Sequence, residues 1–190
     1  MTDRISALVA QSAMPSGGRV YGDELSLAVL PARTVIVLRL ATPTPKVVEA
    51  MRVAERPLPQ AMNTWSGDDP AFCRIAPDTW LLISSLHEAA ELLDAARTAC
   101  GRKSCAITDL SDAHVTIALD GPRAARLLAR GCSLDLSATT FGMNACTRTR
   151  LAQLPVMLRR LTTERFECLV DRAATQYLYD WMQDAAAGLD

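Results

Sequence analysis

The sequence predicts an α+β protein with mostly antiparallel sheets, made of two ferredoxin-like β-α-β-β-α units. Strand-like alternation and helix-like apolar stripes follow one another twice in the same order, over about residues 33–110 and about 111–190. Each pass holds two strands joined by a short turn that contains proline, as split βαβ units do. The two passes share a pattern but almost no residue identities.

The first unit is expected to contain six elements. They are a strand over Thr34–Leu40, a helix over Pro45–Glu55, a hairpin of Phe72–Ile75 and Trp80–Ser84, a helix over Glu88–Cys100 and a strand over Cys105–Leu110. The hairpin turns at Pro77-Asp78, because proline pre-sets a turn and aspartate hydrogen-bonds its backbone. Trp80 and Leu81 then point to opposite faces of the sheet. Since both faces are apolar, we expect this strand to be covered on both sides.

The second unit opens on a strand over His114–Leu119, where apolar and small residues alternate. Asp120-Gly121-Pro122 ends that strand and starts a helix over Pro122–Arg130, with proline in the first turn. Gly131 occupies the expected C-cap of the helix. The remaining elements are a hairpin of Cys146–Gln153 and Val156–Leu161 across Pro155, a strand over Phe166–Val170 and a helix over Ala174–Ala186.

Residues 1–32 are expected to form an extended N-terminal arm ahead of a single domain at 33–190. This segment contains Gly17, Gly18 and Gly22, and it has few apolar anchors before Leu25. Such a composition does not favour packing into a core. We expect the arm to become ordered mainly against partner subunits.

Composition excludes several classes of partner. Lys and Arg total 20 against 21 Asp and Glu, so the formal net charge is −1 and no nucleic acid is expected to bind. No apolar run approaches the roughly 18 residues of a membrane span, and no secretory signal is present, so a cytoplasmic protein without a membrane partner is expected. The six cysteines are scattered without a Cys-x-x-Cys pair, which indicates free thiols.

No motif predicts a catalytic residue, a cofactor site or a metal site. His87 and His114 lack the spacing of metal ligands, and the glycines form neither a dinucleotide fingerprint nor a phosphate loop. Cys132 is interpreted as a core thiol, with a Cys132–His114 nucleophile pair as the alternative. Asp109 and Asp112 are interpreted as turn-forming residues, with a folate or amine site as the alternative.

Five residues are predicted to contact partners. On the C-terminal helix, the stripe of Tyr177, Leu178, Trp181, Met182 and Ala185 is expected to face the core, which leaves Tyr179 toward a partner. A second aromatic residue lies in the turn-rich loop at 59–70, and aromatic residues there favour interfaces. The predicted interface residues are Trp65, Arg123, Arg126, Arg130 and Tyr179.

Three stretches closely resemble the gamma subunits of bacterial heterotetrameric sarcosine oxidases. They are residues 107–136 with Phe141, then Ala76–Leu82, and then Tyr177–Trp181. The resemblance covers roughly residues 33–187. It departs at Ala76 and Thr79, where the family tends to have glycine and glutamate; both replacements are tolerable in a turn.

The resemblance implies the folate-binding fold of aminomethyltransferases and a non-catalytic subunit of an oxidase complex. That complex oxidises sarcosine to glycine, passes the one-carbon unit to tetrahydrofolate or releases formaldehyde, and forms hydrogen peroxide. FAD, FMN, NAD and tetrahydrofolate are then held by other subunits, and the partners are alpha, beta and possibly delta chains. The alternatives are the equivalent subunit of a related N-methyl amino acid dehydrogenase and a stand-alone folate-binding protein.

Overall fold

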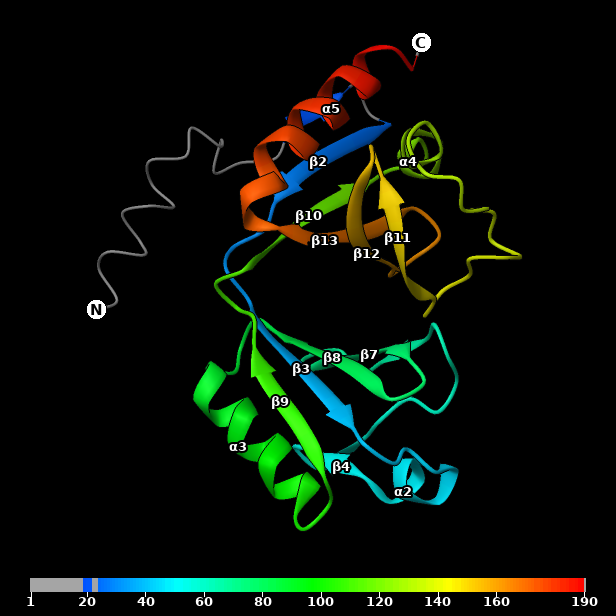
Figure 1. Ribbon diagram of the computed structural model, residues 1–190. Helices are drawn as coiled ribbons and strands as arrows, with labels where there is room; N and C mark the ends of the chain where they lie inside the picture. The colour runs from blue at the N-terminus through cyan, green and yellow to red at the C-terminus, as the bar shows by residue number, and fades with distance from the viewer. Residues whose placement is uncertain (1–18, 22–23, 190) are drawn as a thin grey trace.

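The computed structural model describes residues 19–21 and 24–189, and its strands form two large antiparallel sheets. Each sheet makes up one half of the molecule and carries helices on one face (Figure 1). The predicted α+β class with mostly antiparallel sheets is confirmed. Residues 1–18, most of the predicted arm, lie outside the described residues.

The first sheet has six strands in the order β1-β2-β10-β13-β12-β11. Their bounds are β1 Arg19–Tyr21, β2 Leu25–Val29, β10 His114–Asp120, β11 Cys146–Leu151, β12 Leu154–Arg160 and β13 Arg165–Asp171. Its outer face is covered by α4 (Ala124–Ala129) and by α5 (Thr175–Ala187), which follows a 3₁₀ turn at Arg172–Ala174.

The second sheet has five strands in the order β6-β7-β8-β3-β9. Their bounds are β3 Thr34–Leu40, β6 Trp65–Ser66, β7 Ala71–Ala76, β8 Thr79–Ser84 and β9 Cys105–Asp109. The apolar stripe of α3 (Ala89–Cys100) packs on this sheet, together with α2 (Pro45–Ala50) and a small hairpin of β4 (Arg52–Val53) and β5 (Arg56–Pro57).

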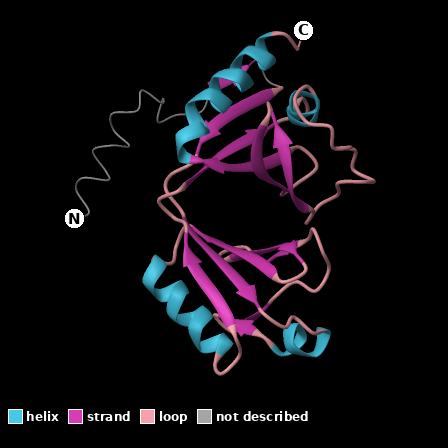
Figure 2. Cartoon of the chain, in the orientation of Figure 1, coloured by secondary structure: helices cyan, strands magenta, loops and turns pink. Residues whose placement is uncertain are grey.

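The two sheets pack face to face, so the molecule has four layers with the helices outside (Figure 2). Seven buried residues join the sheets: Val35, Cys73, Leu81 and Ile83 from one, and Cys146, Met157 and Leu169 from the other. Trp80 lies on the helix side of β8, whereas Leu81 lies between the sheets. The expectation that this strand is covered on both faces is therefore confirmed.

The two sheets share a strand order. The run β7-β8-β3-β9 in one sheet has the same arrangement as β12-β13-β10-β2 in the other. We propose that residues 33–110 and 111–190 are pseudo-repeats on this basis. The last strand of the second unit is supplied by β2, which precedes both units in the chain.

The position of β2 corrects the expected boundary of the arm. Residues Leu25–Val29 pair with β10, and Leu25 and Leu27 are 3% and 0% exposed. The assignment of residues 25–29 to an extended arm is therefore wrong. The physical reason is that β10 has a free edge, which β2 fills while its two leucines enter the core.

Two further boundaries differ from the expectation. The helix expected over 45–55 ends at Ala50, because Met51 is already extended, with φ −80° and ψ 129°. The chain then enters the β4–β5 hairpin, where Ala54 and Glu55 take positive φ values in the turn. The second hairpin turns at Ala152-Gln153, with φ values of 50° and 70°, rather than at Pro155. Paired positive φ values are those of the tight turn that suits the twist of a two-stranded hairpin. Pro155 lies inside β12, before its pairing with β13 begins.

Candidate functional site

A groove of about 630 Å³ lies between the two sheets at one side of their shared core. Its apolar lining includes Val37 and Leu81 from one sheet and Met157 and Leu169 from the other. Its polar lining comes almost wholly from the six-stranded sheet: His114, Arg148, Thr149, Arg150 and Asp171, with Thr79 across from them. The groove therefore combines an apolar floor with a mainly basic rim.

The rim residues differ in how far they are engaged. His114 and Asp171 are opposite each other in the β10–β13 ladder. The Nδ1 atom of His114 lies 3.3 Å from the carbonyl oxygen of Leu110, and the Asp171 carboxylate accepts the backbone N–H of Ala173 at 2.8 Å. Arg148 and Arg150 are exposed and form no ion pair within the described ranges. The two arginines are thus the charges that this rim offers to a ligand.

A buried ion cluster lies deeper between the sheets. Glu167, 3% exposed, accepts Nε–H of Arg159 at 2.9 Å and an Nη1–H of Arg33 at 2.8 Å. Burial opposes ionisation of Glu167, but the charges of Arg159 and Arg33 outweigh it and lower the pKa of this carboxyl. The guanidinium of Arg159 also stacks 5.1 Å from the ring centre of Trp65. The cluster ties β12, β13 and the start of β3 together.

Two thiols, Cys73 and Cys146, meet beside this cluster in the shared core. The hydrogen bond from Cys146 lowers the pKa of Cys73, and the Arg159 charge acts in the same direction. The same contact, with burial, raises the pKa of Cys146. Both side chains are 0% exposed, so neither thiol is available to a substrate.

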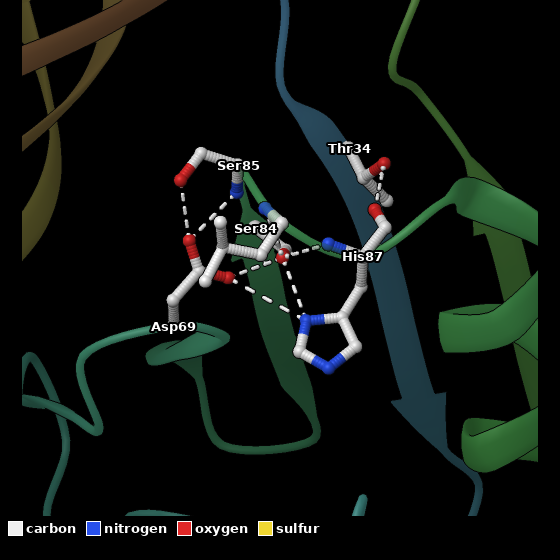
Figure 3. Close-up of polar contacts among 6 residues, drawn as sticks. Thr34, Asp69, Ser84, Ser85 and His87 are labelled. Atoms are coloured by element: carbon white, nitrogen blue, oxygen red, sulfur yellow. Dashed lines mark hydrogen bonds and ion pairs between the residues drawn. The ribbon is translucent and has the colours of Figure 1, made fainter.

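Figure 3 shows a polar cluster where β8 ends. The carboxylate of Asp69 accepts the Ser85 backbone N–H at 2.8 Å and the hydroxyls of Ser84 and Ser85. Burial alone raises the pKa of Asp69, but these hydrogen bonds bring it to about 2. Nδ1 of His87 lies 3.0 Å from Ser84 Oγ. Sequence reasoning missed this cluster, since no local motif joins Asp69 to Ser84.

The cluster has the residue types of a Ser-His-Asp relay without its geometry. In such a relay the serine and the aspartate contact different ring nitrogens of the histidine. Here Ser84 Oγ and Asp69 Oδ1 approach the same atom, Nδ1 of His87, at 3.0 and 3.6 Å. Ser84 is 1% exposed, and its oxygen also accepts the backbone N–H groups of Leu86 and His87. The cluster therefore stabilises the turn between β8 and α3.

The three arginines on and beside α4, Arg123, Arg126 and Arg130 (the arginine stripe), differ in their contacts. Arg123 forms an ion pair with Glu24, and Arg130 donates to the carbonyl oxygens of Ala185 and Gly188 at the end of α5. Arg126 is exposed and forms no ion pair within the part of the chain that the structure describes. Two of the three arginines thus serve contacts within the chain.

The two predicted aromatic contacts are placed differently from expectation. Tyr179 is 1% exposed and packs in the core under α5, whereas Tyr177 is 55% exposed. The prediction that Tyr179 faces a partner is wrong, because the buried side of α5 is shifted by one residue from the expected stripe. Trp65 is half-buried, and its Nε1–H donates to the carbonyl oxygen of Arg160 at 3.0 Å. The structure does not bring these aromatics together with the arginine stripe.

The remaining sequence candidates have structural partners. Cys132 packs in the core on the helix side of the six-stranded sheet, while His114 lines the groove on the opposite side, so the two do not form a pair. Asp109 accepts the N–H of Ser111 at 2.9 Å, and Ser111 Oγ accepts the N–H of Val35. These bonds support the interpretation of Asp109 as a turn-forming residue.

Two of the cysteines expected to be free, Cys100 and Cys105, form a disulfide between α3 and β9. Among the described residues, no group of three or more His, Cys, Asp or Glu side chains is arranged to hold a metal ion. Within the same residues, no helix is long and apolar enough to span a membrane.

Comparison with known proteins defines the class of this fold. The family model described as the GCVT N-terminal domain matches residues 63–190, and the chain belongs to this family. At the level of fold alone, it resembles the glycine cleavage system aminomethyltransferase T from Bartonella henselae, with a TM-score of 0.61, 15% identity, and coverage of 84% of this chain and 45% of that chain.

A more specific likeness is to sarcosine oxidase subunit gamma. Identity is 33% with the subunit from Corynebacterium sp. (strain U-96) and 32% with that from Corynebacterium sp. (strain P-1), each over 130 residues and 67% of this chain. Those matches span 62% and 63% of the relatives' own lengths. One chain of the heterotetrameric sarcosine oxidase from Corynebacterium sp. U-96, solved with pyrrole 2-carboxylate, matches this chain with a TM-score of 0.80 and 28% sequence identity. The match covers 96% of this chain and 93% of the solved chain. The predicted resemblance is confirmed.

Proposed function

We propose that this chain is a non-catalytic gamma-type subunit of a cytoplasmic sarcosine oxidase complex. In this proposal the complex oxidises sarcosine to glycine, reduces oxygen to hydrogen peroxide and passes the one-carbon unit to tetrahydrofolate. The observation that carries the proposal is the likeness to one chain of a heterotetrameric sarcosine oxidase, which extends over 96% of this chain.

The described polar clusters favour a structural role over catalysis. Ser84 and the Cys73–Cys146 pair are buried, and the Ser84–His87 contact lacks the geometry of a relay. A general base must reach its substrate, and a nucleophile must be accessible to it. Ser84, Cys73 and Cys146 are not accessible, and the hydroxyl that His87 contacts is that of the buried Ser84, which supports a subunit that contributes packing surface and assembly.

The strand-to-helix turn at Gly121 does not fit the phosphate of a nucleotide cofactor, the kind that the larger subunits are proposed to hold. A phosphate cradle at a strand-to-helix turn needs open space beside a glycine. Gly121 lies at such a turn, but a Cβ built there would be 2.3 Å from the carbonyl oxygen of Glu24. The β2 region therefore already fills that space. We therefore propose that FAD, FMN and NAD are held by the alpha and beta-type subunits, and in the same proposal the resemblance to the gamma subunits implies that tetrahydrofolate is held there too.

Two of the predicted interface residues remain in this proposal. Arg126 is exposed on α4, and Trp65 is half-buried beside Arg159 of the buried ion cluster. Both have surface that a partner subunit can cover. Arg123 and Arg130 contribute through the contacts that they make within the chain.

The proposal is tested by comparing the isolated chain with a co-expressed assembly. The full chain is produced alone and together with alpha- and beta-type sarcosine oxidase subunits from the same organism, and flavin absorbance and sarcosine oxidation are measured for both. The isolated chain is expected to be colourless and inactive, and the assembly to be yellow and active. A flavin spectrum or sarcosine turnover in the isolated chain would falsify the non-catalytic assignment.

A further inference from the structure

The outer edge of β11 has a gap in its hydrogen bonding. In an antiparallel strand, successive residues direct their N–H and C=O groups alternately to the two sides. The carbonyl of Ala145 accepts Arg160 N–H at 3.0 Å toward β12, whereas Cys146 N–H donates outward to Asn63 at 2.8 Å. The backbone groups of Arg148 and Arg150 therefore also point outward.

The two ends of this edge are covered, and its middle is not. Beyond β11, Ala152 N–H donates to the carbonyl of Gly131 at 3.1 Å, which closes the far end as Asn63 closes the near end. Among the residues that the structure describes, the outward N–H groups of Arg148 and Arg150 have no backbone acceptor. The edge thus offers a short template for one more strand.

The groove adjoins this free edge. In the strand pairing, Arg148 is opposite Met157 of β12, which is in turn opposite Leu169 of β13. Met157 and Leu169 line the groove between the sheets, so the Arg148 side chain lies on that same face. Arg150 is on the same face, two residues further along. Charged residues also protect edge strands from aggregation, but that role needs no apolar groove beside them. Three features therefore coincide within the described part of the chain: two outward N–H groups without a backbone acceptor, an apolar floor, and two exposed arginines without an ion pair.

We propose that β11 is the docking strand for an extended segment of a partner subunit, which adds to the sheet beside Arg148 and Arg150. Main-chain hydrogen bonds fix the added strand, and its alternate side chains enter the groove. Those side chains are apolar over Met157 and acidic near the two arginines, since charge complementarity sets the register of such contacts. The inference rests on the proposed function for the existence of partner subunits.

The test compares amide hydrogen exchange in the isolated full chain and in the co-expressed complex. The Arg148 and Arg150 amides are expected to exchange at least about tenfold more slowly in the complex. The double variant Arg148→Glu/Arg150→Glu is expected to lower the affinity for the complex by about tenfold or more. Arg102→Glu, which reverses an exposed arginine at the α3–β9 turn, serves as the matched control and should assemble normally.

The outcomes separate this inference from the proposed function. The melting temperature of the isolated double variant is measured first, and it should match that of the wild type, because both arginines are exposed. A complex that assembles with both amides unprotected overturns the docking strand and leaves the subunit assignment intact, as does normal assembly of the double variant. A wild-type chain that joins no complex overturns both.

Discussion

Arg159 and Glu167 face each other on neighbouring strands inside the space between the two sheets, with the arginine Nε 2.9 Å from the carboxylate. They are 5% and 3% exposed, and Arg33 adds a second charge to the same oxygen from the other half of the molecule. The pair therefore joins β12 to β13 at a buried, charged position, and Arg33 ties it to the segment that leads into β3.

Replacing Glu167 with Gln is expected to destabilise the chain by about 3–5 kcal/mol, because Arg159 then remains buried without a counter-charge. Chemical denaturation of the isolated chain measures the loss. Glu164→Gln, an exposed neighbour in the turn before β13, is the control and should cost little. An unchanged unfolding midpoint for Glu167→Gln would show that the cluster does not stabilise the fold.

Replacing Trp80 with Ala is expected to cost about 3–5 kcal/mol, as for other large core aromatics. The side chain is 0% exposed, and its Nε1–H donates to the Pro59 carbonyl at 3.1 Å. Thermal unfolding of the isolated chain should therefore begin at a lower temperature before any partner is involved. Leu86→Ala, at a side chain that is 80% exposed, is the control. A variant that keeps its melting temperature but fails to assemble contradicts the core assignment.

The contribution of Asp69 to stability is expected to depend on pH. Its pKa in the folded chain is about 2, below the ordinary value of 3.8, so its contribution is complete above about pH 4 and is lost as pH falls toward 2. Asp69→Asn should cost about 1.5–3 kcal/mol at pH 6, the usual range for hydrogen bonds to a charged group. Urea titrations from pH 6 to pH 2.5 should show the difference between variant and wild type shrinking. A constant difference would contradict the assignment of the low pKa.

Gly131 is expected to be required for the packing of α5. A Cβ at this position would lie 2.5 Å from Trp181 Cη2 and 3.1 Å from the Ala152 nitrogen. Gly131→Ala should therefore cost about 1–3 kcal/mol through overpacking. In a Trp181→Leu background the cost should be smaller, since the six-membered ring is gone, and a double-mutant cycle measures that coupling. Equal costs in both backgrounds would rule out the ring contact as the cause.

Local patterns in the sequence were enough to predict much of this fold. The alternation at residues 114–119 and the turn at Pro77-Asp78 correspond to β10 and the β7–β8 hairpin. In these segments the spacing of apolar side chains over a few residues indicates which face of the element is covered. The resemblance at residues 107–136 also predicted the family, and the similarity to known proteins confirms that prediction.

The remaining features depend on contacts between distant residues. β2 packs against β10, which lies about ninety residues later, and its Leu25-Ser26-Leu27 alternation is too short to identify a strand alone. The cluster of Asp69 with Ser84 and the ion pair of Arg159 with Glu167 exist only once strand register is set. The sequence prediction for Tyr179 is wrong because the apolar stripe of the helix does not fix whether Tyr177 or Tyr179, two positions apart, faces the sheet. The groove also needs both sheets, so no segment of sequence predicts it.

The central claim, that this chain works as one subunit of a hetero-oligomer, is tested most directly by native mass spectrometry. The full chain carries an affinity tag, is co-expressed with alpha- and beta-type sarcosine oxidase subunits from the same organism and is purified without crosslinking. The account predicts one assembly in which the chain is present in fixed ratio with different, larger partner chains. A single species at the mass of the chain alone, 20.6 kDa plus the tag, with the partners recovered as a complete active complex without it, would contradict the account.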